Sequence, residues 1–280
     1  MRAGLIFMEN KGEKTMNGKI LLRAAAALLL VLACAAMTAG CIHISIGSRF
    51  VALTGDCTTL RETPDANEVY RIEIDNMSFT DSKNVSINIA YSDTPYVEAV
   101  VSEDLLDYGF AITMKNGVLR VAPNKHLELK TDRFELTIHA RFDEIELSGG
   151  YDVTVDANGA EALSLRVSGA ADGRIDNLHV REFEAKVSGA GSFALSGEAE
   201  EATIHISGAG DIEAAGLVCG TLDAKISGAG DMTVSVLDAL DAKISGVGSI
   251  AYYGSPTVTQ SVSGLGTVTQ QAAKLPGAWG

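Results

Sequence analysis

A Ser-Gly pair recurs seven times in phase in the second half of this 280-residue chain, at spacings of 20, 20, 19, 20, 18 and 18 residues, and one further pair, at Ser196, is out of phase. The serines of the pairs in phase are Ser148, Ser168, Ser188, Ser207, Ser227, Ser245 and Ser263. A near-constant period of this length is typical of proteins in which each repeat is one structural unit that buries its apolar face by stacking on its neighbours. The period therefore constrains the fold more than any other feature of the sequence.

Apolar residues alternate with polar residues around each pair. The residue before the serine is always apolar: Leu147, Val167, Val187, Ile206, Ile226, Ile244 and Val262. The pattern resumes after the turn at Phe193, Ile212, Met232, Ile250 and Val268. A period of two predicts half-buried strands, and stacked coils would place equivalent residues about 4.8 Å apart in continuous columns. We therefore predict an all-β parallel β-helix, or β-solenoid, with coils of 18–20 residues. A meander or sandwich of hairpins would not need the same residue at the same phase seven times.

Glycine and aspartate mark the predicted corners between strands. The corner residues are Gly208, Gly210, Asp211, Gly228, Gly230, Asp231, Gly246 and Gly248. Glycine permits both a positive φ and a close approach of stacked backbones. The aspartates of successive corners could hold Ca²⁺, but each coil offers only one carboxylate, so we expect them to bond their own backbone and expect no metal.

The chain divides into five predicted segments. Residues 66–147 alternate in longer strands and form opening coils or a layer that caps the solenoid, with a hairpin at Asn116-Gly117. Residues 148–270 form the repeated coils, and residues 271–280, which include Trp279, form a tail or a small cap. Residues 1–41 and 42–65 precede them.

Residues 1–41 have the features of an export signal. Lys19 and Arg23 precede a short apolar run, and Met37-Thr38-Ala39-Gly40-Cys41 resembles a bacterial lipobox, which predicts lipidation at Cys41. Cleavage to a free form or retention of the run as a membrane anchor are the alternatives, although the run is shorter than the ~20 residues of a spanning helix. We expect residues 42–65 to be a flexible tether, and the protein to be exported and lipid-anchored at the cell envelope.

Two cysteines lie beyond the signal region, Cys57 and Cys219. In an exported protein they could pair, or both could remain free thiols.

A basic column lies two residues before the repeat serines and consists of Arg166, Lys186, His205, Lys225 and Lys243. Acidic residues lie two positions earlier, at Glu144, Glu184, Asp223 and Asp241. The basic column could be a binding face, or the two columns could be a nearly neutral solvated sheet surface. The formal charge of −14 argues against nucleic acid as a partner.

Several stretches resemble one bacterial family. They are Ser207-Gly-Ala-Gly-Asp211, Ser227-Gly-Ala-Gly-Asp231, Ile250-Ala-Tyr-Tyr-Gly-Ser-Pro-Thr257 and Val262-Ser-Gly-Leu-Gly266. Over about residues 68–270 the chain resembles the auto-transporter adhesin, head GIN domain family. This resemblance implies a right-handed parallel β-helix on the cell surface, with adhesion proposed and no catalytic residues assigned. Ser148-Gly-Gly-Tyr-Asp152 departs from the pattern, because a tyrosine occupies the turn.

Three classes of function remain after these observations. The first is an adhesin-like protein that binds a surface protein or glycan, and the second is an envelope structural or regulatory module without an extracellular ligand. The third is a polysaccharide-active enzyme, which would need a distinct carboxylate pair or metal site in one groove. The acidic residues mostly recur with the repeat, and the five histidines show no metal-ligand spacing, so we expect no catalysis and no cofactor. The sequence leaves the oligomeric state open.

Overall fold

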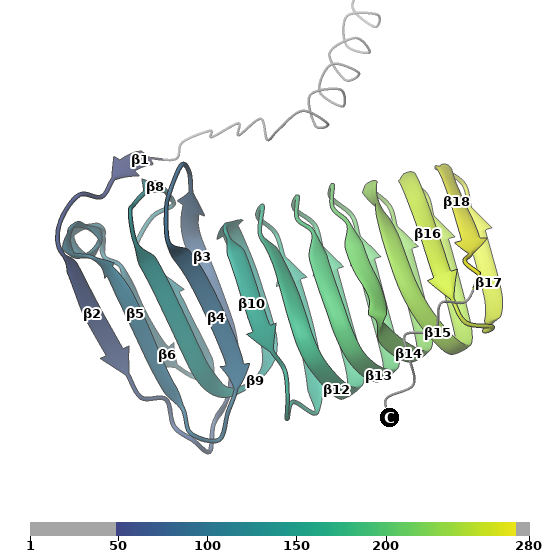
Figure 1. The fold of residues 1–280 in the computed structure, drawn as a ribbon, viewed down its shortest axis with the longest axis horizontal. Helices are drawn as coiled ribbons and strands as arrows, with labels where there is room; N and C mark the ends of the chain where they lie inside the picture. Colours follow the sequence, from purple (N-terminus) through teal and green to yellow (C-terminus); the bar gives the residue numbers. More distant parts are fainter. Residues whose placement is uncertain (1–48, 273–280) are drawn as a thin grey trace, which may run out of the picture. The chain divides into compact units, whose positions relative to one another are not determined.

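The computed structural model describes residues 49–272, and nearly all regular structure in this range is β-strand. The strands stack along one axis, and most neighbouring strands run parallel (Figure 1). This is the predicted β-solenoid, with about six turns and a β-rich region before them. Within residues 49–272 no helix has the length and apolar character needed to span a membrane.

The β-rich region contains nine strands and one short 3-10 helix. These are β1 (Arg49–Ala52), β2 (Cys57–Glu62), β3 (Val69–Phe79), β4 (Val85–Tyr91), β5 (Tyr96–Ser102), η1 (Glu103–Tyr108), β6 (Ala111–Lys115), β7 (Val118–Ala122), β8 (Leu127–Lys130) and β9 (Phe134–Gly150). β3 and β4 run parallel to β9, as coils do, whereas β5 pairs antiparallel with both β2 and β9. The region therefore combines the opening coils and the capping layer that the sequence left as alternatives.

The predicted hairpin is confirmed. β6 and β7 pair antiparallel and are joined by Asn116 and Gly117, with φ of 53° and 74°. Two consecutive positive φ values define the tight turn that Asn-Gly favours.

The coils continue through the second half of the chain. Their strands are β10 (Asp152–Asp156), β11 (Ala162–Val167), β12 (Asp172–Val187), β13 (Phe193–Ile206), β14 (Ile212–Ile226), β15 (Ala229–Ile244), β16 (Val247–Tyr253), β17 (Thr257–Val262) and β18 (Leu265–Gln270). From β12 to β15 one strand runs through both sides of a coil and bends between them, at irregularities such as the one near Gly197. Each coil is thus closed by one bend and one Ser-Gly corner.

The interior column predicted from the repeat is present. Val187 pairs with Ile206, Ile206 with Ile226, and Ile226 with Ile244, and all four side chains are buried. The column after the corner also forms, because Phe193, Ile212, Met232, Ile250 and Val268 are successive partners. Gly173 precedes Phe193 in this column, and a Cβ there would lie 2.8 Å from the phenylalanine ring. Glycine in one coil therefore makes room for a large side chain in the next.

Close approach of stacked backbones explains the first glycine of each corner. A Cβ on Gly228 would lie 1.9 Å from the carbonyl oxygen of Gly208, to which the Ala229 N–H donates a hydrogen bond of 2.9 Å. The same arrangement recurs at Gly208 and Gly246. Of the six predicted corner glycines, only Gly248, with φ of 152°, has a positive φ. The requirement is therefore mainly steric, and positive φ is a minor part of it.

The flexible tether predicted over residues 42–65 is wrong in its second half. β1 pairs parallel with β8, and β2 pairs antiparallel with β5. Val51 and Leu53 are buried against the core, which gives this segment a reason to be ordered. Cys57 is consequently fixed in β2 as an exposed free thiol, and Cys219 is a separate buried thiol whose pKa burial raises to about 12.

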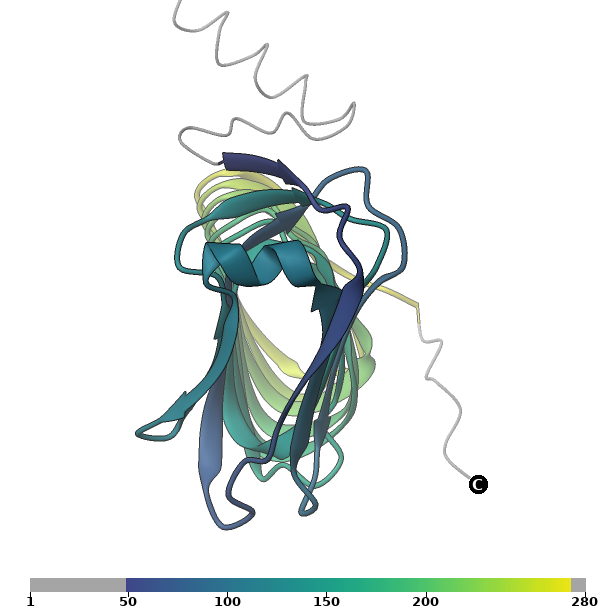
Figure 2. The same cartoon turned by 90° about the vertical axis from the view of Figure 1, so that its left-hand side faces the viewer.

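The N-terminal end of the stack is covered. In Figure 2, η1 lies across the near end, above the interior between the two walls of strands. Leu105 of η1 is fully buried in the core. η1 therefore covers the core at this end, while β2 and β6 each pair with a single strand within residues 49–272 and keep one free edge.

Candidate functional site

A shallow groove of about 530 Å³ crosses the coils beside the Ser-Gly corners. One repeat serine from each of five successive coils lines it: Ser148, Ser168, Ser188, Ser207 and Ser227. We call it the serine groove. Because parallel strands lie about 4.8 Å apart, it presents one hydroxyl at each such step along the axis.

Three of these hydroxyls are available to a ligand. Ser188 donates its hydroxyl to the Val167 carbonyl at 3.1 Å, and Ser148 donates its hydroxyl to Asp75. The exposed hydroxyls of Ser168, Ser207 and Ser227 make no hydrogen bond within residues 49–272. Each can both donate and accept a hydrogen bond.

Four of the five residues predicted as a binding face line the groove. Arg166, Lys186, His205 and Lys225 occupy one position in successive coils, in register from strand to strand. Lys243 is the next residue of this column but lies outside the groove. The strand register thus converts the sequence repeat into a row of cationic and imidazole groups beside the serines.

Carboxylates neutralise part of this row. Arg166 Nε lies 2.6 Å from Glu144, and Lys186 Nζ lies 2.5 Å from Glu184. Hydrogen bonding to Glu144 raises the pKa of Arg166, and the hydrogen bond from Lys186 lowers the pKa of Glu184. Lys243 is held in the same way, 2.6 Å from Asp241. Most of the basic column is therefore internally paired.

Lys225 differs from its neighbours. Its ammonium makes no ion pair or hydrogen bond within the described part of the chain. The carboxylate two residues earlier, Asp223, instead faces His205, at 4.0 Å. Desolvation lowers the pKa of His205, and the lysines beside it act in the same direction, against Asp223. Among the described residues that line the groove, Lys225 is thus the lysine or arginine without a carboxylate partner.

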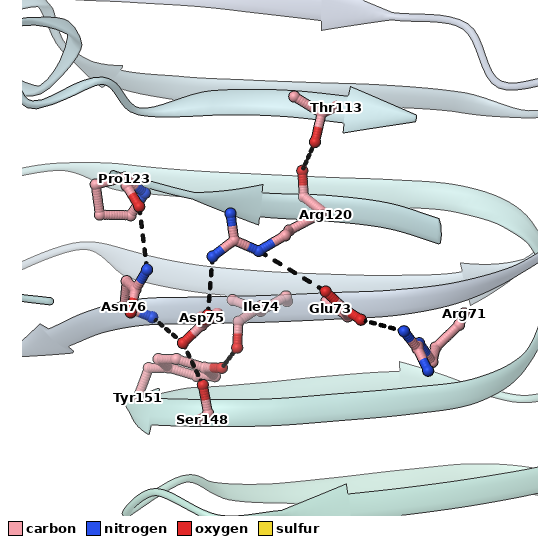
Figure 3. A network of polar contacts seen from close by, with 10 residues as sticks. All are labelled: Arg71, Glu73, Ile74, Asp75, Asn76, Thr113, Arg120, Pro123, Ser148 and Tyr151. Atoms are coloured by element: carbon pink, nitrogen blue, oxygen red, sulfur yellow. Dashed lines mark hydrogen bonds and ion pairs between the residues drawn. The ribbon is translucent and has the colours of Figure 1, made fainter. Parts of the chain in front are cut away.

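The N-terminal end of the groove is acidic and is held by a polar network (Figure 3). Asp75, on β3, accepts hydrogen bonds from Arg120 at 2.9 Å, from Ser148 and from the backbone N–H of Asn76. Burial acts to raise the pKa of Asp75, but these hydrogen bonds together outweigh it and lower the pKa. The network fixes the first coil to the β-rich region.

Tyr151 completes this junction. Its side chain is buried, and its hydroxyl donates a hydrogen bond of 2.6 Å to the Ile74 carbonyl (Figure 3). Burial raises the pKa of this phenol. The sequence signal was the tyrosine in a corner that otherwise holds small residues, but its partner on β3 lies 77 residues away. The repeat alone could not reveal that contact.

The corner aspartates bind the next coil, which corrects the expectation that they bond their own backbone. Asp211 accepts a hydrogen bond of 2.8 Å from the N–H of Asp231, which in turn accepts one of 2.7 Å from Ser249. Among residues 49–272, no group of three or more His, Cys, Asp or Glu residues is placed to hold a metal ion. Gly208, Gly210, Gly228, Gly230, Gly246 and Gly248 stack at the same corners. Cys41 and the predicted signal segment 1–41 lie outside the described residues, as does Trp279.

The family model described as "Putative auto-transporter adhesin, head GIN domain" matches residues 80–256. The chain belongs to this family. Membership of the head GIN domain family indicates an adhesin-like protein of the cell surface or envelope. No curated protein matches the sequence.

Solved structures agree with this assignment. A "putative adhesin" from Parabacteroides merdae is 26% identical, has a TM-score of 0.57 and covers 80% of this chain and 100% of its own. A "putative adhesin" from Bacteroides fragilis is 24% identical, has a TM-score of 0.66 and covers 79% of this chain and 100% of its own. A "putative lipid binding protein" from Parabacteroides distasonis is 18% identical, has a TM-score of 0.61 and covers 80% of this chain and 100% of its own. The last two share the fold with this chain.

Proposed function

We propose that this head GIN domain protein is a lipid-anchored, surface-exposed protein that binds a glycan or protein partner in the serine groove and catalyses no reaction. The observation that carries the proposal is the groove itself, in which three free serine hydroxyls lie beside a lysine that has no ion-pair partner within residues 49–272. Membership of an adhesin family supports a binding role.

The chemistry of the groove suits an extended polar ligand. Ser168, Ser207 and Ser227 offer hydroxyls that donate and accept, and Lys225 offers three donors and a positive charge. Such groups bind the hydroxyls and carboxylates of a glycan, or the backbone and acidic side chains of a peptide. Because the other cations are already paired, Lys225 is expected to contribute most to binding.

Binding can be tested with residues 48–280 alone. The buried core lies between Val51 and Ile250, inside the compact unit Ser48–Gly280. We would measure binding of this fragment to glycan and host-matrix arrays, first as wild type and then as Lys225→Ser. We expect at least about a tenfold loss of affinity, since a charged hydrogen bond contributes roughly 1.5–3 kcal/mol.

Lys243→Ser is the matched control. It removes the same charge from the same column one coil further on, but outside the groove and from an existing ion pair. We expect it to change affinity less than about twofold. Equal losses in both variants, or unchanged binding when Lys186, Lys225 and Lys243 are all replaced by serine, would count against this face.

The lipid anchor is proposed at Cys41 because a lipobox-like sequence precedes it. Metabolic labelling with palmitate should mark the wild type and not Cys41→Ala. Cys57→Ala is the control, because Cys57 is an exposed thiol that should not affect labelling. Continued labelling of Cys41→Ala would refute this site.

The non-catalytic part of the proposal has its own test. Incubation of residues 48–280 with any polysaccharide that the arrays identify should release no product. Release of shortened chains that requires intact acidic residues in the groove would instead support a glycan-active enzyme.

A further inference from the structure

The C-terminal end of the solenoid is open within the described residues. β17 pairs only with β15, and β18 only with β16, so each has one edge without a strand partner in residues 49–272. Such an edge presents unpaired N–H and C=O groups to any strand that approaches it. Nothing in this range covers the core at this end as η1 covers it at the other.

This end also lacks the charges that usually protect an edge. Residues 244–272 contain no Asp, Glu, Lys, Arg or His, although charged residues make up 21% of the chain. The charged columns stop at the last coil, where Thr259 follows Asp241 and Ser261 follows Lys243. Proteins commonly place lysine or other charges on exposed edges to prevent pairing, and this edge has none.

Apolar side chains accompany the open edge. Val262 ends the interior column at 42% exposure, although the residues before it in that column are buried. Leu265 and Val247 occupy the corner position held by alanine in earlier coils, and they are 78% and 54% exposed. Gln260 follows buried Ala242 and presents an amide that both donates and accepts hydrogen bonds.

We propose that the open end pairs with the same end of a second copy of this chain, with the last coils of the two copies edge to edge. In an isologous contact the same surface patch of each copy faces the other, so an edge with a net charge would bring two patches of the same sign together. The formal charge of −14 acts against association of two copies over most of the surface. The uncharged last coil is the place where an identical surface can approach without that cost.

The expected dimer is weak and reversible. Six-residue strands are about 20 Å long, and two sheets about 10 Å apart with outward side chains make the end about 20 Å wide. The contact would therefore bury roughly 400 Å² per copy, or about 800 Å² in total, which is less than the ~1,200 Å² at which standard specific interfaces begin and fits a weak, transient dimer. Unsatisfied strand edges supply the specificity through antiparallel hydrogen bonds.

Sedimentation velocity of residues 48–280 at increasing concentration tests the proposal. The wild type should shift toward the dimer as concentration rises, and Gln260→Lys/Leu265→Lys should weaken association at least tenfold. Both changes are at exposed positions, so the fold should be retained. The matched control, Thr221→Lys/Ala229→Lys, adds the same charge at exposed positions in the middle of the solenoid and should dimerise as the wild type does.

Three outcomes would overturn the proposal. The first is a monomeric wild type at every concentration, and the second is equal association of the two lysine variants. The third concerns residues 273–280: if only a chain ending at Ala272 dimerises, this segment covers the edge instead of a second copy. We expect removal of these residues to leave the dimer unchanged.

Discussion

The coils from β11 onward repeat one contact in every layer, whereas the region from β1 to β9 makes its key polar contacts once. In the coils, Gly189, Gly208, Gly228, Gly246 and Gly264 each approach the carbonyl of the glycine one coil earlier. At the junction, polar contacts of Asp75, Arg120, Ser148 and Tyr151 form a single network that has no counterpart elsewhere in residues 49–272.

This difference shows two ways to hold a stack of strands together. In the coils, each layer contacts only its neighbours, so stability is a sum of similar terms and the sequence must repeat. At the junction, individual hydrogen bonds take the place of the repeated backbone contacts and hold the first coil against the β-rich region. A disruption in the coils should therefore cost more than a disruption at the junction, which the following substitutions test in order of expected effect.

Gly228→Ala should have the largest effect. Its Cβ would lie 1.9 Å from the Gly208 carbonyl oxygen, so two coils must separate at a corner where both backbones are fixed. We expect a loss of about 4 kcal/mol or more in the free energy of unfolding, measured by urea denaturation. Ala229→Ser, at the exposed next residue, should change it by less than about 0.5 kcal/mol. An unchanged urea midpoint for Gly228→Ala would show that the corner tolerates a side chain.

Ile226→Ala should follow. Ile226 is fully buried in the middle of the interior column, so its truncation leaves a cavity that costs about 3 kcal/mol. Val262→Ala truncates the same column at its exposed end and should cost less than about 1 kcal/mol. Similar losses in thermal or urea unfolding would mean that the open end is as well packed as the middle.

Tyr151→Phe tests the junction. It removes the hydrogen bond to the Ile74 carbonyl and leaves that buried acceptor without a partner, at a cost of about 1–2 kcal/mol. Tyr252→Phe is the control, because the Tyr252 hydroxyl has no hydrogen-bond partner within residues 49–272. Equal stability of Tyr151→Phe and the wild type would show that this hydrogen bond does not stabilise the junction.

Asp75→Asn should have the smallest effect, and it should depend on pH. The folded state lowers the pKa of Asp75, so the ionised carboxylate stabilises the fold above the unfolded pKa of about 3.9. This contribution is lost as the pH falls through the lower folded value. The wild type should therefore exceed the variant in stability near pH 6, and the difference should shrink below about pH 4. Parallel stability curves over this range would contradict the role of ionised Asp75.

The repeated half of the chain could be predicted from the sequence because equivalent strands of successive coils lie in the same environment, so the same pattern of apolar residues recurs in each. The columns through Ile206 and Phe193 and the Asn116-Gly117 hairpin were all readable from local spacing. The prediction of a tether was wrong at residues 49–62, because long-range pairing with β5 and β8 forms strands there. We also expected the corner aspartates to bond locally, although their partners lie in the next coil.

The candidate site was predicted in part. The basic column was visible as a repeated position, but its pairing was not, so the sequence could not distinguish Lys225 from Lys186 or Lys243. Lys186 and Lys243 pair with the carboxylate two residues earlier on their own strand, whereas the equivalent carboxylate before Lys225, Asp223, faces His205 of the preceding coil.

The sequence by itself determined the coil. Apolar side chains that alternate along each strand and recur about every twenty residues are buried when the repeats stack on one another as parallel coils. The tertiary structure decided how the stack is closed at one end, where the groove lies and which of its groups remain free. These features depend on contacts between residues tens of positions apart, whose geometry exists only after the coils have been stacked.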